Sequence, residues 1–311
     1  MILCCGEALI DFIAMPDGLS YRPCPGGSIL NIAVGLGRMQ VPVGLYSRLS
    51  TDMFGDLLDN YLRKNNVKLN FCPRVKGQTT LAFVSLPEET AQEPRFAFYA
   101  MGAVDRSMTT DDLPVQFGDD VIAMHFGSIS LVLEPGATAL EALMKRESRR
   151  RVLTLDPNVR PAVVSNAEIY RQKFSKWVAL VDILRLSQVD MEYLYPDKSI
   201  EELLPEWFGA GVGLIILTQG VKGSRGYLPN GINVFVPAQK IAVKDTIGAG
   251  DTFFSAALAY LFDHEKLSHR TLVSQMTADE LEACLTFAAK AAAINCTREG
   301  ADPPYKNEMY L

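Results

Sequence analysis

The residues best suited to chemistry lie in one short segment, DTIGAGDT at 245–252, followed directly by an apolar helix candidate. Gly248, Ala249 and Gly250 carry no bulky side chain, so an anion can approach the unpaired N–H groups of the first helical turn. Asp251 stands beside them and can take the proton of a hydroxyl that attacks phosphorus. The segment therefore indicates a phosphate cradle with a general base. The alternative is a glycine turn followed by an acid that merely caps the helix.

The same segment resembles D-T-x-G-A-G-D, the signature of the ribokinase-like (PfkB) family of carbohydrate kinases, at every fixed position. Two further segments, GEALID at 6–11 and GGSILNIA at 26–33, resemble the opening strand and the amino-terminal Gly-Gly signature of that family. Carboxylate and amide groups bind polyols through paired donors and acceptors. The resemblance implies that sugar hydroxyls are bound by Asp11, Gly26, Gly27 and Asn31.

Two segments resemble the nucleotide side of that family. The resemblance of LTQGVKGS at 217–224 implies that ATP contacts Thr218, Gly220 and Gly223, together with Gly248 and Gly250. Residues 288–301 resemble the segment that packs near adenine and supports a monovalent cation, although an Ala-rich helix also suits any packed core. This second resemblance implies a nucleotide role for Asn295 and a K⁺ site on the backbone of Asp245 and Ile247.

The segment LSQVDME at 186–192 departs from the family pattern for the residues that order water and magnesium near the phosphates. Many relatives carry Asn-x-x-Glu there, whereas this chain has Ser187 and Asp190 in the corresponding places. Aspartate is one methylene shorter than glutamate but still offers the hard oxygen that Mg²⁺ requires. The resemblance therefore implies Ser187 near the phosphates and Asp190 on Mg²⁺, with Glu192 as the alternative acid.

Two segments bear on the substrate. DPNVRP at 156–161 resembles fructokinases and 2-keto-3-deoxygluconate kinases, and residues 96–106 resemble the fructokinase lid, which implies that Phe98 and Arg106 face the sugar. A guanidinium at Arg160 suits either a hydroxyl or a carboxylate, and the alternative is a structural ion pair with Asp156 or another neighbour. We therefore expect an ATP-dependent fructokinase. The alternatives are a 2-keto-3-deoxygluconate kinase, a nucleoside kinase and a non-catalytic sugar sensor.

Short apolar runs alternate with amphipathic stretches, which predicts an α/β fold with a central, mostly parallel sheet flanked by helices. The resemblance implies the ribokinase-like three-layer form, as one kinase domain over residues 1–311. The strands expected are 2–5, 43–47, 121–126, 152–156, 183–186 and 214–218. The helices expected are 28–39, 52–65, 137–147, 167–180, 251–262 and 278–296.

One region breaks this rhythm, because 79–86 and 95–100 read as two strands with only the polar turn 87–94 between them. Such a hairpin extends the edge of the main sheet or forms a lid over a cleft. The resemblance implies a small β lid made of segments around 12–24 and 79–101. Exposed lid edges would favour pairing with a second subunit as a homodimer.

Composition excludes several classes of protein. The 311 residues carry a net charge of −6, and the only basic cluster is Arg149-Arg150-Arg151, which we interpret as a solvated loop. No nucleic-acid surface is expected. No apolar run reaches the roughly 20 residues needed to cross a bilayer. Six cysteines without a C-x-x-C pair, together with three histidines, argue against zinc and disulfides and favour a cytoplasmic location.

Overall fold

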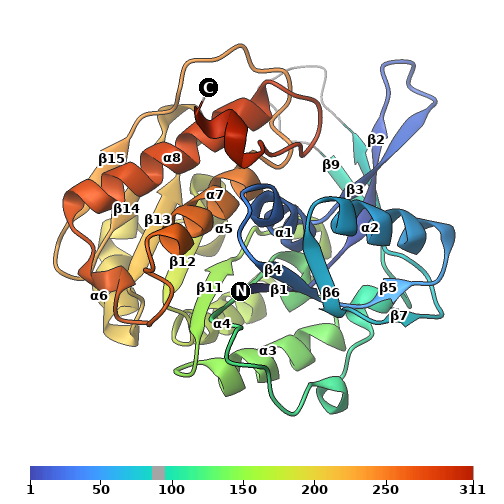
Figure 1. Ribbon diagram of the computed structural model, residues 1–311, viewed down its shortest axis with the longest axis horizontal. Helices are drawn as coiled ribbons and strands as arrows, with labels where there is room; N and C mark the ends of the chain where they lie inside the picture. Colours follow the sequence, from blue (N-terminus) through green and yellow to red (C-terminus); the bar gives the residue numbers. More distant parts are fainter. Residues whose placement is uncertain (86–94, 311) are drawn as a thin grey trace.

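The chain folds around one large sheet between two layers of helices (Figure 1). The computed structural model describes residues 1–85 and 95–310. The nine strands follow the order β15-β14-β13-β12-β11-β10-β1-β4-β6, and only β14 runs against the others, so that its two pairings are antiparallel and the remaining ones are parallel. This confirms the predicted α/β fold. The strands are β1 (Ile2–Cys5), β4 (Val43–Tyr46), β6 (Val67–Phe71), β10 (Ala123–Gly127), β11 (Val152–Asp156), β12 (Ile183–Ser187), β13 (Leu214–Thr218), β14 (Ser224–Tyr227) and β15 (Asn233–Val236).

Alternation along the strands divides the core between the two faces of this sheet. Ile2 and Cys4 of β1 point into the cluster that contains the helices of one face, α1 (Ser28–Arg38), α7 (Ala249–Asp263) and α8 (Ala278–Cys296). Leu3 and Cys5 point into the opposite cluster, with α3 (Gly136–Glu147), α4 (Ala167–Val178) and α6 (Ile200–Ala210). The remaining helices are α2 (Met53–Lys64), packed beside β6, and α5 (Gln188–Leu194), which follows β12. Both faces of the sheet are therefore covered, as a parallel sheet requires.

A second sheet stands at the upper right of Figure 1. It has the order β3-β2-β8-β9, from β2 (Leu9–Ala14), β3 (Tyr21–Gly26), β8 (Leu81–Ser85) and β9 (Arg95–Tyr99). The expected hairpin, β8 with β9, therefore pairs with the 12–24 segment instead of extending the main sheet. We call this second sheet the lid sheet. The polar turn expected at 87–94 lies outside the described residues. A two-stranded ribbon, β5 (Leu49–Ser50) with β7 (Arg74–Val75), completes the strands described.

Several boundaries differ from the sequence prediction. Helix α7 begins at Ala249 instead of Asp251, because Gly248 adopts a left-handed conformation (φ 71°) and serves as its N-cap residue. Strand β10 begins at Ala123, two residues later than expected. Helices α5 and α6 and strands β6, β14 and β15 were not predicted. Both helices carry a local signal, since Ser187 and Ser199 each begin a capping box.

All six cysteines are free thiols, and four of them are buried. Within residues 1–85 and 95–310, no helix has the length and apolar character that a membrane span requires.

Candidate active site

A cavity of about 700 Å³ opens between the lid sheet and the carboxyl ends of the central strands. Its walls are the lid sheet, the first turn of α1, the segments that follow β10 and β11, and the loop that leads into α7. Open α/β sheets bind ligands at this edge, outside the carboxyl ends of their strands. The cavity is therefore the candidate active site.

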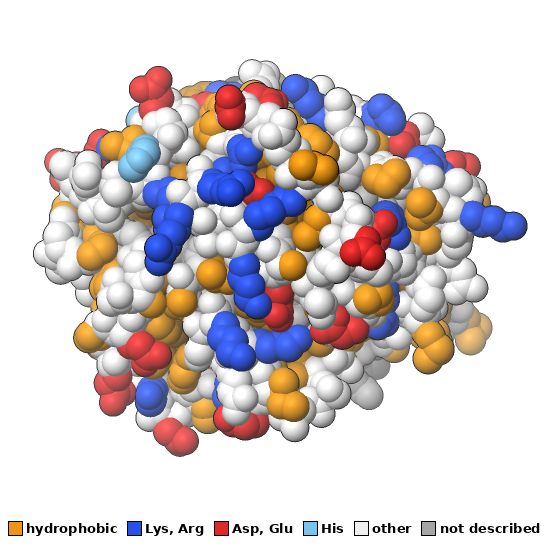
Figure 2. Space-filling view, turned by 90° about the horizontal axis from the view of Figure 1, so that it is seen from below, with side chains coloured by type: hydrophobic (Ala, Val, Ile, Leu, Met, Phe, Trp, Pro, Cys, Tyr) orange, Lys and Arg blue, Asp and Glu red, His pale blue; other side chains and the backbone are white. Residues whose placement is uncertain are grey.

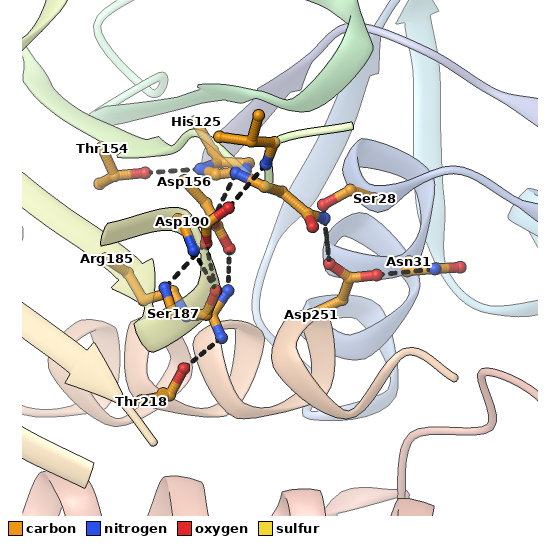
Figure 3. A network of polar contacts seen from close by, with 12 residues as sticks. Ser28, Asn31, His125, Thr154, Asp156, Arg185, Ser187, Asp190, Thr218 and Asp251 are labelled. Atoms are coloured by element: carbon orange, nitrogen blue, oxygen red, sulfur yellow. Dashed lines mark hydrogen bonds and ion pairs between the residues drawn. The ribbon is translucent and has the colours of Figure 1, made fainter. Parts of the chain in front are cut away.

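Asp251 lies at the centre of this cavity and is only 7% exposed. Its Oδ1 accepts a hydrogen bond from Ser28 Oγ at 2.7 Å and its Oδ2 accepts one from Asn31 Nδ2 at 2.8 Å (Figure 3). Asn158 Nδ2 lies 3.4 Å from Oδ1. All three donors are neutral, and no basic side chain of the described residues lies within 4.0 Å of the carboxylate. The carboxylate is thus held in a fixed orientation while remaining able to accept a proton.

The cradle before Asp251 is anchored to α8. The N–H groups of the first turn of α7, including that of Gly250, have no preceding helical carbonyl to bond with. Thr252 Oγ1 donates to Asn295 Oδ1 at 3.2 Å, and Asn295 Nδ2 donates to the Ile247 carbonyl at 2.9 Å. Asn295 is fully buried and does not line the cavity, so the structure gives it a positioning role.

Arg185 places a fixed positive charge under this cradle. A Cβ atom on Gly250 would lie 2.9 Å from Arg185 Nη2, so the helix can rest on the guanidinium only because Gly250 has no side chain. Arg185 donates to Asp156 Oδ2 at 2.7 Å and to Thr218 Oγ1 at 2.5 Å (Figure 3). Burial raises the pKa of Asp156 to about 7, although the Arg185 guanidinium opposes that rise. Arg185 lines the cavity beside the first turn of α7, where a phosphate would bind.

Asp11 supplies a second carboxylate, from the lid sheet. A Cβ atom on Gly26 would lie 2.0 Å from Asp11 Oδ2, so Gly26 leaves room for this carboxylate and does not itself line the cavity. Gly27 does line the cavity, at φ 100° as the N-cap residue of α1. Burial raises the pKa of Asp11 to about 7, the Arg160 guanidinium lowers it, and Asp251 raises it. The negative charge of Asp251 therefore acts on Asp11 across the cavity.

The two arginines expected near the sugar lie in different places. Arg160 lines the cavity, where its guanidinium lies 5.3 Å from the Phe96 ring centroid and Nη1 donates to the Val159 carbonyl at 3.2 Å. Phe98, also on the cavity wall, stacks on Phe96. The alternative ion pair of Arg160 with Asp156 is wrong, because Asp156 pairs with Arg185.

Arg106 does not reach the large cavity. Its Nε donates to the Glu134 carbonyl at 2.9 Å, and its Nη1 lies 3.4 Å from the Ala100 carbonyl. These backbone bonds hold it at the base of the lid sheet. The structure thus shows Arg106 joining two loops, and its expected contact with the sugar stays a prediction.

Asp190 has a positioning role in the structure. Its Oδ1 accepts from the Val159 N–H at 2.7 Å, and its Oδ2 accepts from Ser187, at 2.8 Å from the N–H and 2.6 Å from the hydroxyl. Ser187 lines the cavity, whereas neither Asp190 nor Glu192 does. No cluster of three or more His, Cys, Asp and Glu side chains within 1–85 and 95–310 could hold a metal ion. Both Asp190 oxygens thus serve the fold around the cavity.

The remaining nucleotide candidates lie beside the cavity. Thr218 ends β13 next to Ser187 in the sheet register, and Gly220 and Gly223 follow it in left-handed conformations. A Cβ atom on Gly223 would lie 2.2 Å from the Val236 carbonyl oxygen, so this turn requires glycine. The structure places all three around the end of one strand, outside the cavity walls.

Sequence reasoning missed several residues of the site, namely Glu7, Ser28, Asn158 and Arg185. Arg185 had a signal, since it is the one charged residue in the otherwise apolar strand ILRL at 183–186. Ser28 lies in GGSILNIA and Asn158 in DPNVRP, and the resemblance assigned roles to other residues of these two motifs. Burial raises the pKa of Glu7. Glu7 accepts a hydrogen bond from Ser130, which is too distant along the chain for a local sequence pattern to predict.

Comparison with known proteins agrees with this geometry. Residues 1–308 match the family described as pfkB family carbohydrate kinase. The chain belongs to this family. It is 37% identical over 277 residues to a fructokinase of Rhizobium leguminosarum bv. trifolii, which covers 88% of this chain and 83% of that protein. It is 31% identical to a probable fructokinase-2 of Arabidopsis thaliana, over 97% of this chain and 92% of the relative.

Solved structures agree as well. The fructokinase of Xylella fastidiosa with bound ATP superposes with a TM-score of 0.89 at 26% identity, covering 99% of this chain and 96% of that one. The fold is thus the ribokinase-like fold of PfkB kinases, and the chain is a sugar kinase.

Replacing Asp251 by Asn tests the base of this kinase. Asn cannot accept the hydroxyl proton, and general base catalysis contributes about 10²- to 10⁴-fold, so kcat should fall by that factor. Steady-state ADP release measures it, with KM for both substrates expected to change only a few-fold. Asp263→Asn, at the other end of α7 and paired with Lys306, is the matched control and should keep normal turnover. Near-normal turnover of Asp251→Asn would remove this residue from the role of base.

Proposed function

We propose that this sugar kinase is a cytoplasmic, ATP-dependent fructokinase. One observation carries the proposal: the Asp251 carboxylate is held by Ser28 and Asn31 beside the first turn of α7, inside a cavity that the lid sheet borders. The fructokinases among the relatives support fructose as the sugar. The free cysteines suit the reducing cytoplasm, where ATP is available.

The reaction begins with fructose between the lid sheet and the main sheet. Asp11 and the Gly27 backbone bind its hydroxyls, and a primary hydroxyl lies against Asp251. MgATP lies across the carboxyl ends of β12 and β13 with its γ-phosphate at the first turn of α7. The hydroxyl oxygen attacks the γ-phosphorus, Asp251 takes the hydroxyl proton, and the bond to the β,γ-bridging oxygen breaks to release ADP.

The transferring phosphoryl group carries charge on its equatorial oxygens, which the site must stabilise. The N–H groups around Gly250 and the positive end of α7 supply part of this stabilisation. Arg185 supplies the rest from below, and its position is fixed by Asp156 and Thr218 before any substrate binds. Phe96 and Phe98 of the lid sheet help to exclude water, which would otherwise accept the phosphoryl group.

On the nucleotide side, we place the adenosine of MgATP near Thr218, Gly220 and Gly223, as the family resemblance implies. Ser187, at the end of β12, then lies beside the phosphates. Mg²⁺ enters with ATP as part of the substrate. Asp190 would reach it through the Ser187 turn and ordered water, since its own oxygens already accept three hydrogen bonds from Val159 and Ser187.

The choice of sugar is tested by comparing kcat/KM for fructose, 2-keto-3-deoxygluconate, ribose and adenosine with MgATP. Fructose should exceed each rival at least tenfold. A preference for the sugar acid would instead make Arg160 a carboxylate clamp, and Arg160→Lys would then lose most of the activity because it loses the bidentate fork. Absence of turnover with every substrate would favour a non-catalytic sugar sensor.

We also propose that K⁺ supports the cradle from the loop before α7. Asp245 accepts from the N–H of Ile247 at 2.9 Å and from that of Gly300 at 2.8 Å, which fixes the turn whose Asp245 and Ile247 backbone oxygens the family resemblance implies as K⁺ ligands. Such oxygens suit K⁺, whose hydration shell they can replace. Exchanging KCl for choline chloride at constant ionic strength should lower kcat several-fold, and an unchanged rate would refute the proposal.

The lid sheet also suggests a homodimer. Its outer strands are β3 and β9, and apolar side chains near them are largely exposed, with Leu19 at 89%, Tyr99 at 65% and Met101 at 91%. Unpaired strand edges with exposed apolar residues favour pairing with another chain. Sedimentation equilibrium at micromolar concentration should give the mass of two chains, and the mass of a single chain would contradict the pairing.

A further inference from the structure

A second cavity lies at the opposite edge of the main sheet. It measures about 440 Å³ and is bordered by the segments that lead into β10 and β11 and by the loop that follows α7. Helix α3 lies at the lower edge of Figure 1, and Figure 2 views this edge from below, with Lys and Arg side chains gathered across the middle of the face. The charged and imidazole side chains of the cavity wall are Asp119, Glu147, Arg149, Arg150, Arg151, His269 and Arg270. We call it the basic cavity.

The last arginine of the 149–151 triplet builds the wall of this cavity. Arg151 Nε donates to Glu147 Oε2 at 2.9 Å, and Arg151 Nη2 donates to the Phe117 carbonyl at 3.0 Å. Arg146 donates to the other oxygen of Glu147 at 2.8 Å. The buried Glu147 is therefore already shared by two guanidinium groups. The turn after α3 and the 117–121 loop form one rigid rim.

The first two arginines of the triplet are available to a ligand. Arg149 and Arg150 are both exposed, and neither forms an ion pair or a side-chain hydrogen bond with any residue of 1–85 or 95–310. Arg149 adopts φ 73°, a left-handed conformation that side-chain-bearing residues rarely take. Two unpaired guanidinium groups thus project from a turn whose other members are fixed.

A third arginine faces them from a distant part of the chain. Arg270 donates through Nε to Asp182 Oδ1 at 2.7 Å, which orients its guanidinium and leaves both Nη groups for another acceptor. The four arginines of the wall outnumber its two acids, Asp119 and Glu147, giving a local charge of +4 − 2 = +2. The whole chain carries −6, so this cavity stands out from the general charge.

We propose that the basic cavity binds a small phosphorylated molecule, held by Arg149, Arg150 and Arg270. Guanidinium forks match the geometry of phosphate oxygens and bind them in a bidentate manner. The volume lies in the range of small-molecule sites, about 300–1,000 Å³, and the concave wall suits a compact ligand better than an extended polymer. His269 adds a further polar group to this wall.

This site is separate from the kinase site. The strands β10 and β11 run parallel, so their amino ends border the basic cavity and their carboxyl ends border the active site. Helix α7 joins the two regions, since its first turn carries Asp251 and the chain beyond its last turn reaches His269 and Arg270. A phosphorylated ligand in the basic cavity therefore binds outside the cavity that contains Asp251.

The test is isothermal titration calorimetry with inorganic pyrophosphate as the probe, at fixed free Mg²⁺. One equivalent per chain of a non-hydrolysable MgATP analogue occupies the phosphate cradle without an excess that would compete for the basic cavity, so pyrophosphate reports on the second site. One pyrophosphate per chain should bind the wild type, and Arg149→Ala with Arg150→Ala should weaken Kd at least tenfold. The matched control, Arg63→Ala with Lys64→Ala on α2, removes the same charge elsewhere and should leave Kd unchanged.

A second variant guards against misfolding. Arg149→Gly suits the left-handed backbone, and together with Arg150→Gln it should also lose pyrophosphate while keeping its melting temperature and fructokinase rate. Absence of pyrophosphate binding to the wild type would overturn the proposal, as would an equal loss in the α2 control. Binding of a twelve-nucleotide oligothymidylate without binding of pyrophosphate would overturn it too, in favour of a nucleic-acid surface.

Discussion

The buried ion pair between Arg185 and Asp156 is the constraint on which the rest of the active site depends. Charges taken out of water are costly unless they are paired and hydrogen-bonded. Here the pair is satisfied only when β11, β12 and β13 end in register, because Asp156, Arg185 and Thr218 each come from a different strand. Gly250 then rests on the guanidinium, so the pair also determines how closely α7 approaches the sheet.

Asp251, unlike Asp156, has no charged partner among its hydrogen-bond donors. Its hydrogen-bond donors Ser28 and Asn31 come from α1 and are neutral, so the carboxylate is oriented without an ion pair. A cationic partner would favour the ionised form and make the carboxylate a weaker base. In the proposed reaction, the site thus separates two tasks: the buried Arg185 guanidinium serves the phosphate, and the Asp251 carboxylate, with its neutral neighbours, serves the hydroxyl.

Much of this could be predicted from the sequence, for physical reasons that differ between elements. The buried parallel strands were recognisable because both of their faces are apolar, and the 245–252 segment because its glycines precede a helix. The edge strand β15 was missed because a half-exposed strand lacks that continuous apolar pattern, and β14 because its sequence, SRGY, carries polar residues and glycine although it is mostly buried. Arg106 and Asp190 were assigned from their place in motifs, yet their hydrogen bonds join segments up to 31 residues away, which local sequence cannot reveal.

The lid sheet and the catalytic carboxylate are connected by continuous chain. Strand β2 carries Asp11, its partner β3 ends at Gly26, and two residues later Ser28 begins α1 and holds Asp251. In the proposed reaction, a shift of the lid sheet on sugar binding would therefore act on Asp11 directly and on the donors of Asp251 through this short connection. Residues 9–31 thus form one covalent segment that leads from one carboxylate of the cavity to the hydrogen-bond donors of the other.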